Sequence, residues 1–343
     1  MGTPVMSSAS VKKILGVLLQ MAVTGAALGF VFHDPHKRAR MGEACRHADW
    51  RWLVAGLGVY GLVELLAVVR WQLLLRIQGF RLSWARATGI LFIGEFFLTF
   101  TPGLVGGDAM RIIYLVKDAP EKAVDAVTVV LMDRIMGMLA LICLAASIVG
   151  LRHGWLLQSA ASSRLVEAML LILAGGAVAL VLGLVVAWVG VPERWPVPQT
   201  LRELAGAFRQ FAKDWRGTLG AFGTTLASHA CYYSAFGCAA LALGHLSRPA
   251  PTFGDVFAIM PVENTLTALP ISFAGIGLRE SLFQTLLHDL ARVPQAVGAL
   301  IGAAGFSMKL LWSLPGAFVF LTHRLTRKTD APAIPDSRRT GGR

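Results

Sequence analysis

Charged residues are scarce in this chain: aspartate, glutamate, lysine and arginine make up only 15% of its 343 residues, while 55% are hydrophobic. The mean hydropathy is +0.61. A soluble protein of this size needs far more polar surface, so the composition excludes that class. Acidic residues are fewer than basic ones, 20 against 32. The basic residues lie between apolar runs and form no separate domain, so nucleic acid is not the expected partner. Basic loops beside anionic lipid headgroups explain the positive charge instead.

The sequence also lacks the motifs of several catalytic and metal-binding classes. Its four cysteines form no CxxC pair and have no histidine cluster near them, so we expect no metal and no other cofactor. No GxxxxGK[ST] phosphate loop is present, which argues against drive by ATP hydrolysis. No HExxH motif or nucleophile elbow occurs, and His229 stands alone in an apolar run. These absences argue against an enzyme.

Long apolar runs are what the sequence does contain, and six of them reach the roughly 20 residues that a helix needs to cross a bilayer. Lys12 and Lys13 precede the first run, which lacks a cleavage site and is expected to remain as a span. The sequence therefore predicts an all-α polytopic membrane protein with a single membrane domain over 1–343. The predicted spans are 11–33, 52–75, 121–150, 165–190, 217–245 and 294–322.

Two polar stretches interrupt this pattern, within 84–115 and 252–283. The first contains EFFLTFTPGLVGGDAMR at 95–111 and the second ENTLTALPISFAGIGLR at 263–279. Irregular backbone at membrane depth is tolerated only inside protein or beside a wet cavity, so we interpret both as re-entrant or broken helices. An offset of 168 residues aligns them without a gap, matching Glu95, Leu98, Thr99, Pro102, Gly107 and Arg111 with Glu263, Leu266, Thr267, Pro270, Gly275 and Arg279.

The offset divides the chain into two halves, 11–150 and 165–322, each with three spans and one broken helix. Because three is an odd number, the halves run in opposite directions through the membrane. The predicted fold is thus an inverted repeat whose re-entrant helices enter from opposite faces. In transporters built this way the substrate site lies at the repeat interface.

Basic residues predict the orientation. With the N-terminus in the cytoplasm, the loops after spans two and four and the C-terminal tail carry most of the arginine and lysine, as the positive-inside tendency requires. Only the first loop disagrees. Both termini are therefore expected on the cytoplasmic side of a bacterial inner membrane. Residues 199–215 have apolar positions at helical spacing and suit an interfacial amphipathic helix, whereas 329–343 are polar and suggest a disordered tail.

Charged residues inside spans cost about 2.5–3.5 kcal/mol each at the bilayer centre, so those present need a partner or a function. For Glu64, Arg70 and Lys309 we expect internal pairing or snorkelling. The pairs Glu95/Arg111 and Glu263/Arg279 recur at one spacing beside a Pro-Gly break, which packing alone does not require. Free N–H groups at a half-helix N-terminus and the forked guanidinium both suit phosphate, and the glutamates could hold the arginines when the site is empty.

Three stretches, TPGLVGGDAMRIIYL, VVLMDRIMGML and LPISFAGIGLRESLF, resemble the lysylphosphatidylglycerol synthase transmembrane family over roughly 11–322. The resemblance implies a flippase-like fold with two re-entrant elements. An Asp-Arg pair replaces the Glu-Arg pair common in the family's third span. No aminoacyltransferase domain follows the last span, so lysyl-lipid synthesis is not implied. The positions that match the family are Pro102, Gly106, Gly107, Asp108, Arg111, Asp133, Arg134, Pro270, Gly275, Gly277, Arg279 and Glu280.

These observations predict a lipid flippase or scramblase that moves a phospholipid or another phosphate-bearing lipid between leaflets. The candidate substrate-binding residues are Glu95, Glu263 and the family-matched positions apart from Gly277. Two alternatives remain open: a membrane enzyme acting on a lipid-linked substrate, and a non-transporting partner of an envelope-lipid enzyme. Membrane lipids are the expected partners, and a homo-oligomer is left open.

Overall fold

The computed structural model describes residues 42, 46–101, 105–189 and 199–329, and helices dominate these residues, with no strand among them. Five of the helices are long and apolar enough to cross a membrane, so the chain is a multi-pass membrane protein. They correspond to the second to sixth predicted spans; the first, 11–33, lies outside the described residues, as does the predicted tail after Thr329. The five are Trp50–Ile77 (α3), Pro120–Leu156 (η1, Pro120–Lys122, with α6, Ala123–Leu156), Ala160–Gly183 within α7 (Ala160–Val189), Trp215–Gly244 (α9) and Gln295–Thr322 within α12 (Gln295–Thr329).

Two helices are interrupted where the sequence combines proline and glycine. The first interruption separates α4 (Trp84–Phe100) from α5 (Val105–Asp118), and the second separates α10 (Phe253–Thr267) from η2 (Phe273–Gly275) and α11 (Leu278–Ala291). Thr101 ends α4 in an extended conformation, which the following proline favours. In the second interruption Ala274, Gly275 and Gly277 have positive φ, a region that glycine adopts without strain. Each half thus presents a helix, a break and a second helix.

The helix boundaries follow the sequence repeat. Moved by 168 residues, α4 falls on 252–268, where α10 occupies Phe253–Thr267, and α3 falls on 218–245, where α9 occupies Trp215–Gly244. Packing follows the same correspondence, because α4 contacts α12 and its counterpart α10 contacts α6. Each broken helix therefore packs against a span of the other half.

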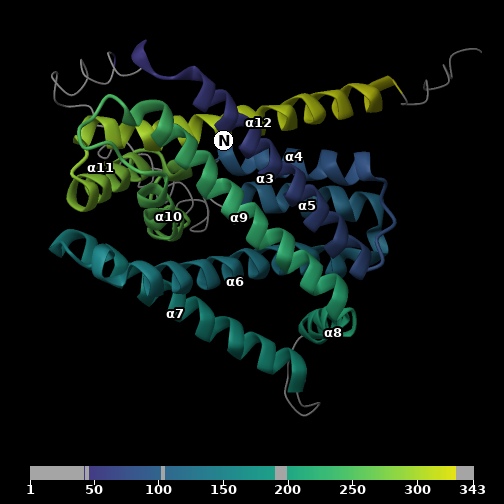
Figure 1. Cartoon of the computed structure of the whole chain (residues 1–343). Coiled ribbons are helices and arrows are strands. Elements are labelled where there is room, and N and C mark those ends of the chain that lie inside the picture. The colour runs from purple at the N-terminus through teal and green to yellow at the C-terminus, as the bar shows by residue number, and fades with distance from the viewer. Residues whose placement is uncertain (1–41, 43–45, 102–104, 190–198, 330–343) are drawn as a thin grey trace, which may run out of the picture.

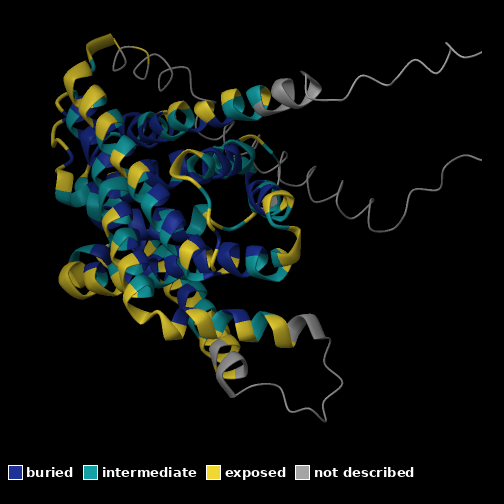
Figure 2. Ribbon diagram, turned by 90° about the vertical axis from the view of Figure 1, so that its right-hand side faces the viewer, coloured by how far each residue is buried: buried dark blue, intermediate teal, exposed yellow. Residues whose placement is uncertain are grey.

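The α3–α9 contact is the most extensive in the structure, and the two broken helices lie on either side of this pair (Figure 1). One buried cluster surrounds α4 and α5 and includes Trp71, Ile90 and Leu115. The other surrounds α10 and α11 and includes Tyr233 and Phe283. Figure 2 shows the buried residues gathered inside the bundle and exposed residues along its margin. The apolar core therefore packs the helices that flank each break.

Glycine permits one of the closest of these helix contacts. A Cβ atom on Gly316 of α12 would overlap the backbone carbonyl of Phe92 in α4. Backbone atoms cannot give way as a flexible side chain can, so glycine is required for α12 to lie this close to the broken helix.

The predicted interfacial segment 199–215 contains α8 (Gln199–Lys213), which contacts α6, α7 and α9. Ala207 and Phe211 of α8 are buried, whereas Arg209 and Lys213 are exposed. Figure 1 shows α8 nearly end-on beside the start of α9. The helix therefore crosses the end of the bundle with its apolar side inward.

Candidate functional site

Arg111 lies in the second turn of α5 and is the centre of the first charged cluster. Its side chain is 3% exposed; Nη2 donates to Glu95 Oε1 at 2.6 Å and Nη1 to Asp133 Oδ2 at 3.2 Å. The guanidinium also lies 5.3 Å from the ring of Trp71. A Cβ atom on Gly94 would overlap the Arg111 side chain, so this glycine makes room for the arginine across the break.

Asp133 of α6 joins two arginines. Besides accepting from Arg111, its Oδ1 accepts from Arg70 Nε at 2.7 Å. Arg70 therefore pairs internally, as the sequence predicted, whereas neither Glu64 nor Lys309 has an ion-pair partner within 4.0 Å among the described residues. Asp133 is 5% exposed, which makes this a buried ionic network with favourable geometry.

The neighbouring Arg134 takes part in a different pair. Its Nε and Nη2 donate to the two carboxylate oxygens of Asp108 at 2.9 and 2.7 Å, and both side chains are partly exposed. Asp108 and Arg134 thus form a bidentate pair between α5 and α6, without an ion pair to the Arg111 cluster among the described residues. The predicted residues of the first motif divide into a buried set and an outer pair.

The second motif has the same buried Glu–Arg pair. Arg279, in the first turn of α11, donates from Nε to Glu263 Oε1 at 2.8 Å; the side chains are 3% and 0% exposed. Thr267 Oγ1 donates to the same carboxylate oxygen at 3.1 Å. The Arg279 guanidinium lies 4.3 Å from the ring of Phe306. Gly275 leaves space here, because a Cβ atom on it would stand only 3.0 Å from Arg279 Nη2.

Both pairs cross their break in the same way. The glutamate stands near the C-terminal end of the helix before the break, and the arginine stands 16 residues later near the start of the helix after it. The pair therefore ties the two half-helices together in each half. It also places a guanidinium beside the N-terminal end of a half-helix, where backbone N–H groups favour an anion.

The other predicted positions have varied surroundings. Glu280 is buried and its Oε2 accepts from Gly277 N at 2.6 Å, so it caps α11. A Cβ atom on Gly106 would overlap Thr101 Oγ1, and one on Gly107 would overlap the Gly94 carbonyl; the two glycines allow close approach of α4 and α5. Pro270 is exposed in the second break. Pro102 lies outside the described residues.

Two side-chain atoms of the Glu263–Arg279 pair are buried without a hydrogen-bond partner. They are Arg279 Nη1 and Glu263 Oε2, and Arg111 Nε is in the same state in the first cluster. A buried polar group left unsatisfied costs about 1–3 kcal/mol, and more when it is charged. Such groups indicate capacity for a further polar partner at each arginine.

Lys309 of α12 links the two clusters electrostatically. It interacts with Glu64 and Glu95 on one side and with Glu263 and Arg279 on the other. Glu64 of α3 is 7% exposed and interacts in turn with Glu95, Lys309, Arg111 and Arg70. Glu64 and Lys309 thus interact with each other and lie beside the repeated motifs, without an ion pair closer than 4.0 Å among the described residues, and their snorkelling stays a prediction. One available signal was that Lys309 is the only charged residue in the predicted span 294–322.

Tyr232 of α9 is a further residue that sequence reasoning missed. It interacts with Glu263 and Arg279, and its position corresponds to Glu64 at the 168-residue offset. The repeat therefore places Glu64 beside the first Glu–Arg pair and Tyr232 beside the second. Reading the offset outside the two motifs would have identified both.

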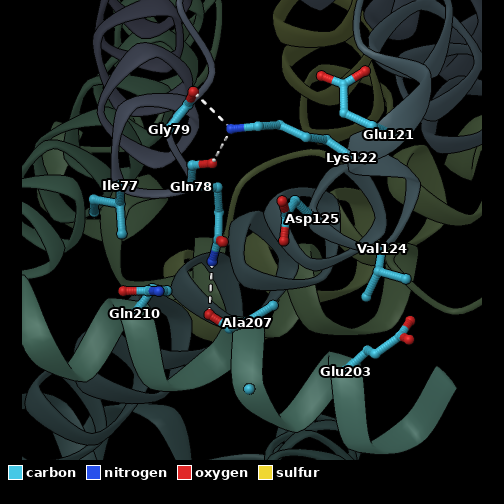
Figure 3. Close-up of a pocket in the computed structure, with 11 residues that line it drawn as sticks. Ile77, Gln78, Gly79, Glu121, Lys122, Val124, Asp125, Glu203, Ala207 and Gln210 are labelled. Atoms are coloured by element: carbon cyan, nitrogen blue, oxygen red, sulfur yellow. Dashed lines mark hydrogen bonds between the residues drawn. The ribbon is translucent and has the colours of Figure 1, made fainter. Parts of the chain in front are cut away.

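A polar pocket of about 630 Å³ lies between α8, the end of α3 and the start of α6 (Figure 3). Lys122 Nζ donates there to the carbonyls of Gln78 at 3.1 Å and Gly79 at 2.8 Å, and Gln78 Nε2 donates to the Ala207 carbonyl at 2.7 Å. Its lining contains none of the predicted site residues. Within the described residues, no three His, Cys, Asp or Glu side chains are grouped so as to hold a metal ion.

The family model described as "Lysylphosphatidylglycerol synthase TM region" matches residues 14–316 of the chain. The match contains both broken helices and all the charged residues described above. No curated protein and no solved structure matches the chain.

Proposed function

The chain belongs to the lysylphosphatidylglycerol synthase TM region family, a membrane domain associated with lipid handling, and from this we propose that it moves a phosphate-bearing lipid between the two leaflets. In this proposal the repeated Glu–Arg pairs and Lys309 receive the lipid headgroup. The chemistry is recognition and translocation, without covalent change to the lipid.

The observation that carries the proposal is the occurrence of one Glu–Arg pair with a buried arginine in each half, at the same sequence spacing across a helix break. A pair needed only for packing has no reason to recur at a break in the helix with buried atoms left unsatisfied. A phosphate offers several strong acceptor oxygens and matches the forked geometry of arginine. Binding it would satisfy the free guanidinium atoms and add a partner for Lys309.

The two arginines are held differently, and this suggests an order of contact. Arg111 has two carboxylate partners, Glu95 and Asp133, whereas Arg279 has one, Glu263. Arg279 also has a free buried Nη1 atom and lies near Lys309. A phosphate therefore displaces less when it binds at Arg279, so we place the first headgroup contact in the second half.

The inverted repeat and the re-entrant character of the broken helices are part of the proposal. Support comes from the matching helix boundaries and from the reciprocal contacts of α4 with α12 and of α10 with α6. Halves of opposite direction would open one Glu–Arg pair toward each leaflet, and the positive-inside tendency would place both termini in the cytoplasm of a bacterium.

The experiment is exchange of fluorescent phospholipids between leaflets of liposomes that contain the purified protein. Arg111→Ala and Arg279→Ala each remove charged hydrogen bonds worth about 1.5–3 kcal/mol, so each should slow exchange roughly 10- to 100-fold. Arg86→Ala is the matched control, because Arg86 also forms an arginine–carboxylate pair, with Asp118, but at the partly exposed surface. It should exchange lipid at the wild-type rate.

Thin-layer chromatography of the lipids after the assay separates transport from the enzyme alternative. We expect every lipid to be recovered unchanged. Normal exchange by both folded arginine variants would refute the site. Absence of exchange for anionic, zwitterionic and polyprenyl phosphate probes would refute transport and favour the enzyme or the assembly partner.

A further inference from the structure

An apolar groove of about 500 Å³ lies where α8 meets α6 and α9. Of its ten lining residues only Thr218 and Trp215 carry a polar side-chain group, a hydroxyl and an indole N–H, and the Thr218 hydroxyl donates to the Phe211 carbonyl at 2.7 Å. The groove thus presents mainly carbon and sulfur surface. Among the residues that form its walls are Met132, Met136, Leu139, Trp215 and Phe222.

The shape of the groove follows the helices that form it. Its walls run from Met132 to Leu139 along α6 and from Trp215 to Phe222 along α9. Seven residues of helix rise about 10 Å, so the groove is about 10 Å long on both sides. Because α6 and α9 are membrane-crossing helices, this length extends into hydrocarbon and suits a segment of acyl chain.

One end of the groove carries positive charge. The Arg216 guanidinium of α9 lies 5.5 Å from the centre of the Trp215 ring, which forms part of the groove wall. Lys213, the last residue of α8, is three residues earlier in the sequence and is exposed. Neither has a carboxylate within ion-pair distance in the described part of the chain. The intervening Asp214 accepts from Gly217 N at 3.0 Å and thereby caps α9. Two cations are thus available where the groove reaches the end of the bundle.

We propose that this groove holds an anionic phospholipid, with an acyl chain between α6 and α9 and the phosphate between Arg216 and Lys213. The choice of occupant rests on charge complementarity and on the position of the groove at the meeting of an amphipathic helix with two spans. The site is separate from the transport site, because Asp133, next to Met132 in sequence, points instead to Arg70 and Arg111. It does not depend on lipid movement.

The test measures which lipid stays bound when the protein is purified in mild detergent with equal amounts of phosphatidylglycerol and phosphatidylcholine. Native mass spectrometry should show phosphatidylglycerol retained in preference. Each surface cation contributes roughly fivefold, so Lys213→Ala/Arg216→Ala should reduce retention of phosphatidylglycerol about 30-fold and leave phosphatidylcholine unchanged. Arg216→Lys should keep the preference. Equal retention of the two lipids by the wild type, or no effect of the double substitution, would overturn the site.

Filling the groove tests the acyl chain separately. Leu139→Trp should lower retention of both lipids, whereas Leu171→Trp should not, because Leu171 is 74% exposed on α7 and outside the groove. A photo-crosslinking amino acid at position 139 should give a lipid adduct. An adduct with a second copy of the chain, or with residues 1–41, would overturn the proposal. None of these measurements involves transport. The groove proposal can therefore be refuted while the transport proposal is supported, and the transport proposal can be refuted while the groove proposal is supported.

Discussion

Removing one carboxylate from each Glu–Arg pair should destabilise the protein to very different extents. Glu263→Gln leaves Arg279 buried at 3% exposure with no carboxylate within 4.0 Å among the described residues. Glu95→Gln leaves Arg111 paired with Asp133, and Glu95 itself is 21% exposed. Glutamine keeps the size of glutamate, so the variants differ from the wild type mainly in charge. The structure thus supplies a matched pair of substitutions.

The magnitudes follow from what each arginine retains. Breaking a buried ion pair from one side costs about 3–5 kcal/mol, since the remaining charge stays desolvated and unpaired. This applies to Glu263→Gln, and the nearby Lys309 increases the repulsion. Glu95→Gln loses one charge-assisted hydrogen bond and should cost about 1.5 kcal/mol. The expected difference between the two variants is therefore about 1.5–3.5 kcal/mol.

The assay is reversible unfolding in mixed micelles, with free energies from linear extrapolation. A double substitution, Glu263→Gln/Arg279→Met, removes the stranded charge and should recover most of the lost stability, which a double-mutant cycle would show as strong coupling. Equal destabilisation by the two glutamine variants, or a double variant less stable than Glu263→Gln alone, would refute the reasoning.

Two further predictions concern α12. Lys309→Met removes a buried charge that has no ion-pair partner among the described residues, so stability should hold or rise while lipid exchange falls roughly 10- to 100-fold. Unfolding and liposome assays on the same variant measure the two effects, and unchanged exchange would contradict the role given to Lys309. Gly316→Ala should cost about 1–3 kcal/mol because its Cβ would overlap the Phe92 carbonyl. Gly175→Ala, in the middle of α7 where nothing lies within 4 Å, should be neutral or stabilise by up to about 1 kcal/mol. Equal effects of the two substitutions would contradict the packing of α12 against α4.

The spans, the helix breaks and the two Glu–Arg pairs could be predicted because each has a recognisable local sequence pattern. Apolar length reveals the spans, and proline with glycine marks the interruptions before α5 and α11. The offset of 168 residues then identifies Glu95 with Glu263 and Arg111 with Arg279. Both pairs form in the structure, at 2.6 and 2.8 Å.

Partner choice could not be derived in the same way. Asp133 and Arg134 are adjacent in sequence, but successive residues of a helix point about 100° apart, so the two cannot face one site together. Asp133 therefore meets Arg70 and Arg111, and Arg134 meets Asp108 on the outer side. Which arginine a carboxylate meets depends on how α3, α5 and α6 pack, and apolar periodicity does not encode that arrangement.

Lys309 has consequences for how a transporter of this kind would work. It is the cation that interacts with the glutamates of both halves, and no counterpart exists in the first half, where the equivalent position is Leu141. The two charged clusters are therefore chemically unequal although the sequence motifs repeat. If the proposed function holds, a headgroup phosphate that leaves Arg279 would meet Lys309 before Arg111, whose carboxylate partners Glu95 and Asp133 it would have to displace. Under the proposed function the slow step is thus the opening of the Arg111 cluster, and Asp133→Asn should speed exchange where Lys309→Met slows it.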